Sequence, residues 1–224
     1  YIIAADLDRD GRKELASLTQ SSAEGKSSLI TVLQVQTDKA VITGSLGVKV
    51  DYADALAAGD LAPNPGLEIL VGDANGALVL VTSTAKDGKL AQLKVWSTIN
   101  DGGAVGPALQ IADLDRDGTL DIVRGSNGGS LMIYHVDKSL SLTTFAQITA
   151  GRLAYGLDLA DLNGDGKLEI VLGRGEAGYA GMTAKDVVVE AYALQGKTLT
   201  RLWSLQTVNR PQPTVLDLDG DGKL

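Results

Sequence analysis

Short oxygen-bearing side chains recur at alternate positions in this chain, and each group is followed by glycine. The best-preserved copy has Asp161, Asn163, Asp165, Gly166 and Glu169 in the stretch DLNGDGKLE. Carboxylate and amide oxygens spaced in this way converge on one point of a tight loop, and they suit a hard cation such as Ca²⁺. Glycine adopts the backbone angles that such a turn requires. The stretch therefore predicts a cation-binding loop.

The same loop returns along the chain at a nearly constant interval. Its first aspartate lies at positions 6, 60, 113, 161 and 217, so the steps are 54, 53, 48 and 56 residues. The copy at 60 is degraded, because Ala62 replaces an oxygen ligand and Pro65 stands where glycine belongs, and we expect no ion there. Regular spacing of this kind indicates a repeat architecture.

Short apolar runs flank the loops and predict β-strands, because they are too short for helices and are bounded by turn residues. The runs that enter the loops are 2–5, 55–58, 109–112, 157–160 and 215–216. Hairpin turns are predicted at 75–76, 87–88, 127–128 and 195–196, where Asn, Asp or Gln precedes Gly. Four antiparallel strands in a repeat of about fifty residues are typical of a β-propeller blade.

The predicted fold class is therefore all-β, a β-propeller. We expect blades at residues 1–46, 53–99, 105–149 and 154–206, and the start of a further blade at 212–224. The chain begins at Tyr1 close to a strand and stops at Leu224 inside a loop. We therefore expect it to be part of a ring of about six to eight blades.

Composition narrows the classes of function. The net charge is −8, and half of the 28 acidic residues lie in the four better loops. This balance disfavours nucleic acid as a partner. No apolar run reaches membrane-spanning length, so we expect no membrane insertion in this segment. The chain has no cysteine, and its single histidine, His135, falls inside a predicted strand, where a structural role is expected.

The motif DxDxDGxxE, followed by an apolar strand and glycine, resembles the FG-GAP or VCBS-type repeat. It is similar to the calcium-loop blades of integrin α-subunit propellers, and the resemblance covers four repeats and the start of a fifth. It implies Ca²⁺ ligands at loop positions one, three, five and nine, with the backbone carbonyl of position seven. Carried over to this chain, the implied ligands are Asp6, Asp8, Asp10, Arg12 and Glu14; Asp113, Asp115, Asp117, Thr119 and Asp121; Asp161, Asn163, Asp165, Lys167 and Glu169; and Asp217, Asp219, Asp221 and Lys223.

Other interpretations of the motifs are weaker. An EF-hand needs glutamate at position twelve, where this chain has Ser17, Arg124 and Leu172, and it needs flanking helices. The GxGxxG pattern at 173–178 precedes a predicted strand, whereas a dinucleotide site needs a helix there. Metal-free Asx-turns remain an alternative for the loops, although unneutralised carboxylates would repel one another.

A binding surface is predicted on the face opposite the cation loops. The loops of that face vary in length, with longer ones at 20–28 and 174–186, and loop variation of this kind often marks a binding face. Trp96, Trp203 and Ile42 take matching places in fourth strands, which predicts packing between blades. The alternative for the loop residues is simple solvation. The candidate contacts are Tyr52, Asn100, Asp101, Arg152, Tyr155, Arg174, Glu176, Tyr179, Asn209 and Arg210.

The favoured function is a calcium-stabilised, non-enzymatic binding or adhesion module with a protein or glycan ligand. The resemblance implies a secreted or cell-surface protein, placed outside the cell or in the periplasm. Two alternatives stay open: the propeller part of a secreted carbohydrate-active enzyme, either a lyase or a hydrolase, and a purely structural spacer. Asp158 is the only charged residue in the predicted first strands, which disfavours catalysis in a central channel.

Overall fold

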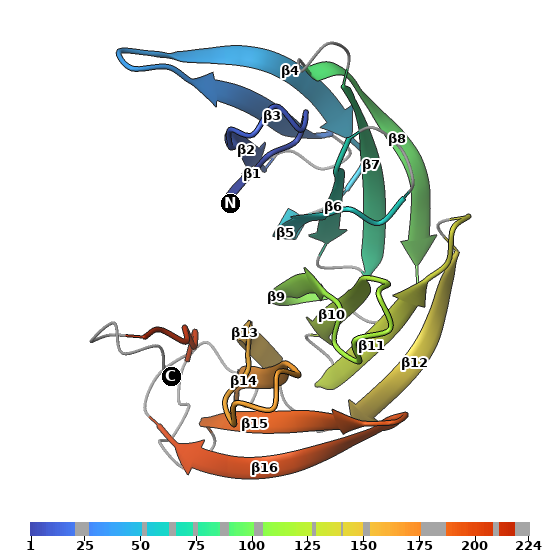
Figure 1. Cartoon of the computed structure of the whole chain (residues 1–224), viewed down its shortest axis with the longest axis vertical. Coiled ribbons are helices and arrows are strands. Elements are labelled where there is room, and N and C mark those ends of the chain that lie inside the picture. The colour runs from blue at the N-terminus through green and yellow to red at the C-terminus, as the bar shows by residue number, and fades with distance from the viewer. Residues whose placement is uncertain are drawn as a thin grey trace. The chain divides into compact units, whose positions relative to one another are not determined.

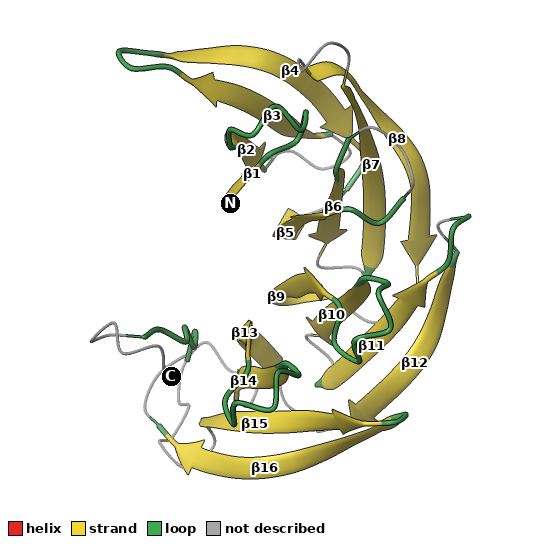
Figure 2. Ribbon diagram, in the orientation of Figure 1, coloured by secondary structure: helices red, strands yellow, loops and turns green. Residues whose placement is uncertain are grey.

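The computed structural model describes residues 1–20, 27–50, 53–62, 66–73, 76–85, 90–100, 105–126, 129–139, 141–149, 153–175, 187–207 and 211–217. Within these ranges the chain forms sixteen β-strands in four sheets and no helix (Figure 2), which confirms the all-β prediction. No helix in the described ranges is long and apolar enough to cross a membrane. Two compact units are present, residues 1–105 with 138–140 and residues 106–137 with 141–224.

The first unit holds two antiparallel sheets whose strands follow chain order (Figure 1). Buried residues of both sheets share one apolar core, in which Leu7, Ile30, Ile69 and Val81 are completely buried. The first sheet contains β1 (Ile2–Ala5), β2 (Glu14–Thr19), β3 (Ser28–Val35) and β4 (Ala40–Val48); the second contains β5 (Ala53–Gly59), β6 (Glu68–Asp73), β7 (Ala77–Ala85) and β8 (Leu90–Asn100).

The second unit repeats this arrangement with two further sheets. Its core joins residues of both sheets, among them Val123, Ile133, Ile170 and Leu172. The first sheet contains β9 (Val105–Ala112), β10 (Asp121–Ser126), β11 (Ser130–Val136) and β12 (Leu142–Thr149); the second contains β13 (Leu153–Ala160), β14 (Glu169–Gly175), β15 (Val188–Gln195) and β16 (Thr198–Gln206). Each sheet is a four-stranded antiparallel blade of the β-propeller type.

Close packing in the second unit depends on a glycine in β10. A Cβ built on Gly125 would come 2.9 Å from the Cβ of Ala108 and closer still to the Cβ of Ala154. Ala154 belongs to β13, the first strand of the following sheet, and β10 and β13 are in contact. The absence of a side chain at Gly125 therefore lets consecutive sheets approach each other.

The structure corrects the strand predicted at 215–216. Residues 211–217 form no strand. Instead, the Val215 N–H donates a hydrogen bond to Asp158 Oδ2 at 2.7 Å, and Pro211 and Gln212 lie against Gly173 and Gly156, which are paired between β13 and β14. The Asp158 side chain therefore holds this segment, which packs where Gly156 and Gly173 have no side chains.

The predicted packing of fourth-strand side chains between blades is wrong for Ile42, although the fourth strands within each unit do contact each other, β4 with β8 and β12 with β16. Ile42 is 63% exposed and Trp203 is 43% exposed, because both lie in outer strands, β4 and β16. The side chain of Trp96 lies outside the described residues. The hairpin at Gln195-Gly196 is confirmed, with Gly196 at a φ of 59°, whereas the turns predicted at 87–88 and 127–128 fall outside the described ranges.

Candidate cation-binding loops

Each of the four loops joins the first two strands of its sheet, and all four share one hydrogen bond to a buried carboxylate. The N–H of the second loop residue, always leucine, donates to the carboxylate of the ninth, and each of these carboxylates is at most 2% exposed. The pairs are Leu7 with Glu14 (2.9 Å), Leu61 with Glu68 (2.8 Å), Leu114 with Asp121 (3.2 Å) and Leu162 with Glu169 (2.8 Å). Because the degraded second loop keeps this bond, the ninth carboxylate clamps the backbone in addition to any ligand role.

A second hydrogen bond recurs in the three loops that keep glycine at position six. There the glycine N–H donates to the first aspartate, and the glycine holds a positive φ that favours residues without Cβ. The pairs are Gly11 with Asp6 (3.0 Å), Gly118 with Asp113 (2.9 Å) and Gly166 with Asp161 (2.6 Å), at φ values of 88°, 86° and 83°.

Among the described loop residues, buried carboxylate oxygens without a hydrogen-bond partner occur only in the first loop. Carboxylate oxygens of Asp6, Asp8 and Asp10 lie within 4.8 Å of one another. Asp6 Oδ1 and Glu14 Oε1 are buried and have no hydrogen-bond partner among the described residues. Burial raises the pKa of Glu14, and repulsion from the three aspartates adds to the rise. Buried oxygens without a donor are costly, so this loop is built for a positive charge.

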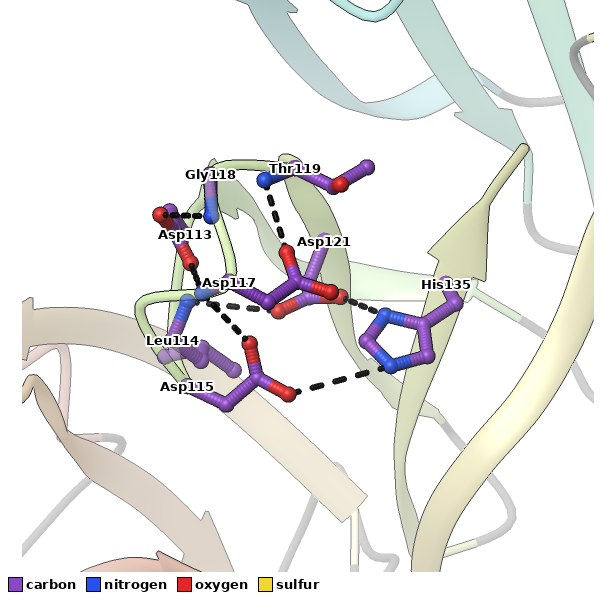
Figure 3. Close-up of polar contacts among 8 residues, drawn as sticks. All are labelled: Asp113, Leu114, Asp115, Asp117, Gly118, Thr119, Asp121 and His135. Atoms are coloured by element: carbon purple, nitrogen blue, oxygen red, sulfur yellow. Dashed lines mark hydrogen bonds and ion pairs between the residues drawn. The ribbon is translucent and has the colours of Figure 1, made fainter. Parts of the chain in front are cut away.

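The third loop includes a residue that the sequence interpretation did not place there (Figure 3). Oxygens of Asp113, Asp115 and Asp121 lie within 4.8 Å of one another, and so do ligand atoms of Asp115, Asp117 and His135. His135 Nδ1 lies 2.5 Å from Asp121 Oδ1, and Nε2 lies 3.8 Å from Asp115 Oδ2. Burial raises the pKa of Asp121, while the bonds from Leu114 and His135 oppose the rise.

The reason for this position is the pairing of β10 with β11, in which Asp121 is directly opposite His135. A histidine that pairs with the ninth loop residue across the two strands places its ring beside the carboxylate of that residue. The sequence could indicate this contact only if the register of β10 and β11 were already known, because the register decides which residue pairs with Asp121.

The fourth loop uses an amide to link its carboxylates. The Asn163 amide nitrogen donates to Asp165 Oδ2 at 3.3 Å and to Glu169 Oε1 at 3.0 Å, while Asn163 Oδ1 accepts from the Asp165 N–H at 2.7 Å. The hydrogen bond from the Lys167 N–H lowers the pKa of Asp165. For Asn163 to serve as an oxygen ligand, its amide has to rotate and give up these bonds.

The remaining implied ligands are only partly described. Asp217 is exposed and lies in the segment without a strand. Asp219, Asp221 and Lys223 fall outside the described residues. In the second loop, Asp60 is paired with Arg9 (2.5 Å), so its carboxylate already faces a cation of the chain itself.

Three residues of the predicted ligand face lie in strands and not in loops. Arg174 belongs to β14 and is 8% exposed, and Tyr155 belongs to β13 and is also 8% exposed. Both were predicted in exposed loops, but the strands extend further than the apolar runs that mark them. Asn100 ends β8 and is not in a loop either. The other candidates, Tyr52, Asp101, Arg152, Glu176, Tyr179, Asn209 and Arg210, lie outside the described residues.

Arg174 instead belongs to a buried charged network on the fourth sheet. Its guanidinium pairs with Glu190, which is 2% exposed and also accepts from the Tyr192 hydroxyl at 2.7 Å and from Arg201 at 3.0 Å. Burial acts to raise the pKa of Glu190, but these hydrogen bonds and the charge of Arg174 hold it below its usual value. Burial and the bond to Glu190 raise the pKa of Tyr192 to about 12.

Comparison with known proteins agrees with this architecture. Residues 113–172, which run from the third loop into β14, match the family model described as an FG-GAP-like repeat. No curated protein shows significant sequence similarity to the chain. A crystal structure of a protein from Lactobacillus plantarum is similar with a TM-score of 0.61 at 15% identity, over 93% of this chain and 56% of that one. This likeness concerns the fold, and the chain spans little more than half of that protein.

Proposed function

We propose that this β-propeller segment, with its FG-GAP-like repeat at residues 113–172, is a calcium-stabilised binding module of a protein that works outside the cell. The observation that carries the calcium part is the pair of buried oxygens in the first loop, Asp6 Oδ1 and Glu14 Oε1, which no donor in the described residues satisfies. A bound Ca²⁺ would supply the positive charge that these oxygens lack.

The residues of the first loop fit such an ion. Asp6, Asp8 and Asp10 bring oxygens within 4.8 Å of one another, and Glu14 adds a buried carboxylate. All of these ligands are hard oxygens, which Ca²⁺ prefers, and a tight loop without fixed octahedral geometry suits Ca²⁺ better than Mg²⁺. The proposed ligands in the third and fourth loops are those implied by the family resemblance, with His135 beside the third set.

Calcium is expected to raise the melting temperature and EDTA to lower it. Modules of this kind bind calcium at roughly 10⁻⁴ to 10⁻³ M, so the titration should extend to about 10 mM. For a dissociation constant of roughly 10⁻⁴ M, about 10 mM free calcium is a hundredfold excess and should raise the melting temperature by about 5–10 °C; at roughly 10⁻³ M the rise should be about half as large. Calorimetry checks the binding heat directly. Absence of both heat and thermal shift would leave the loops as turns without metal.

Two matched variants separate the ligand role from the backbone clamp. Glu14→Gln keeps an oxygen for the Leu7 N–H but removes the negative ligand, so it should reduce the calcium response. Glu68→Gln makes the same change at the same place in the degraded loop, where it should leave the calcium response unchanged. An equal loss in both variants would show that calcium acts elsewhere.

The binding role rests on the prediction from the sequence that a binding face lies opposite the cation loops. We propose that Arg152 and Tyr179 contact a protein or glycan partner, because arginine and tyrosine supply directed hydrogen bonds and apolar area in recognition. In the full-length protein, Arg152→Ala with Tyr179→Ala should weaken binding to hits from glycan and protein arrays at least tenfold, with the calcium response retained. Glu14→Gln should affect stability first. If only Glu14→Gln loses binding at a temperature where it stays folded, the calcium face is the binding face.

A further inference from the structure

Arg9, the fourth residue of the first loop, reaches the second loop of the same unit. Its Nη2 lies 2.5 Å from Asp60 Oδ1 and donates to the Gly66 carbonyl oxygen at 3.4 Å. One guanidinium therefore engages both described ends of the second loop. Arg9 holds a φ of 60°, a conformation that residues other than glycine keep only when their surroundings favour it.

The second loop lacks a donor that the other three loops possess. In those loops the glycine at position six donates its N–H to the first aspartate, at 2.6–3.0 Å. In the second loop position six is Pro65, and proline has no N–H. The guanidinium of Arg9 supplies Asp60 with the missing donor, and it adds a positive charge beside the carboxylate.

Buried contacts next to Arg9 join the same two loops. The Leu67 N–H donates to the Leu7 carbonyl oxygen at 3.4 Å. The hydroxyl of Ser83, which is completely buried, lies 3.0 Å from that oxygen and 2.7 Å from the Leu67 carbonyl oxygen. Because these bonds share acceptors in both loops, the position of the first loop affects the second.

The second unit contains a parallel contact. Arg116 takes the same place in the third loop, at a φ of 64°. A Cβ built on Gly166, in the fourth loop, would fall on the Arg116 guanidinium. The fourth loop keeps its own glycine hydrogen bond to Asp161, so Arg116 packs on that loop and replaces no donor. Because the arginine at loop position four contacts the next loop in both units, this contact is a recurring feature of the repeat.

We propose that Arg9 is a tethered cation for the second loop. It takes over the hydrogen bond that Pro65 cannot make and neutralises Asp60, so that the second repeat is held without a metal ion. Through the same contact, order in the first loop is passed to β5 and β6 of the second sheet.

Hydrogen exchange followed by NMR on the whole chain in EDTA tests this role without calcium. Arg9→Ala should speed exchange of the Leu67 amide roughly three- to fivefold, the upper range for partly exposed ion pairs. Lys13→Ala is the control, since it removes a charge of the same sign from an exposed residue of the same loop that is not a proposed ligand, and it should leave Leu67 unchanged. The Leu162 amide in the second unit should exchange equally in all variants.

A double-mutant cycle adds the decisive comparison. Asp60→Ala in the Arg9→Ala background should add little to the exchange of Leu67, because the shared contact is already lost. Fully additive effects, or equal rates in Arg9→Ala and Lys13→Ala, would overturn the proposal.

The same exchange measurement made with calcium rests on the proposed function, and its result is interpreted separately from the result in EDTA. Calcium should slow exchange of Leu67 in the unsubstituted protein, and Arg9→Ala should lose most of this effect while the first loop still responds. If calcium has no effect on either loop, the proposed calcium role fails, whereas the result in EDTA still decides the role of Arg9.

Discussion

Replacement of Glu190 by alanine is expected to lower the free energy of unfolding by about 3–5 kcal/mol, the cost of removing one partner from a buried ion pair. The substitution removes the carboxylate that pairs with the buried Arg174 guanidinium of β14. The Tyr192 hydroxyl also loses its acceptor. Urea denaturation followed by circular dichroism measures the loss.

Control variants identify the source of this effect. Arg201→Ala removes a partner that is 57% exposed, so it should cost less than about 1 kcal/mol. Arg174→Met combined with Glu190→Met removes both charges and should recover much of the stability, because no buried charge then lacks a partner. A loss in Arg201→Ala as large as in Glu190→Ala would contradict the assignment to Arg174.

The same network predicts a dependence on pH. Because the folded protein holds the pKa of Glu190 below its usual value, the stabilisation is fully present above the pKa of the unfolded chain. It is lost as the pH falls through the lower, folded pKa. When unfolding is measured between neutral pH and about pH 3, the free energy of unfolding of Glu190→Gln should therefore fall less than that of the unsubstituted protein.

The second large effect is expected at Gly125. Gly125→Val should lower the free energy of unfolding by about 3 kcal/mol, the upper part of the usual range for overpacked cores. A side chain there meets the Cβ atoms of Ala108 and Ala154, which cannot rotate away. The backbone of β10 or β13 then has to move, and both strands contribute to the core of the second unit.

Gly47→Ala is the matched control for Gly125. It lies in β4, where an added Cβ would come no closer than 3.6 Å to Ser27, an ordinary contact. Its effect should stay within about 0.5 kcal/mol. Chemical denaturation of both variants, with the intrinsic fluorescence of the two tryptophans as probe, makes the comparison. A stable Gly125→Val variant would mean that β10 and β13 can separate without cost.

The repeat, the all-β class and the local form of the loops could all be predicted from the amino-acid sequence. Apolar runs between turn residues predicted β1, β6 and β10, because alternation and turn chemistry act over a few residues. The glycine of each intact loop was predictable for the same reason, and Gly11, Gly118 and Gly166 all hold positive φ. The acidic spacing also indicated which loops could gather oxygens.

Which residues from different strands contact one another could be learned only from the folded structure. Arg174 was predicted in an exposed loop, but β14 continues to Gly175 and turns its side chain toward Glu190 of β15. His135 contacts Asp121 because the two residues pair across β10 and β11. Arg9 of the first repeat contacts Asp60 of the second. These contacts depend on strand ends, register and the packing of sheets. Such features are set by distant parts of the chain, so short-range patterns carry no signal for them.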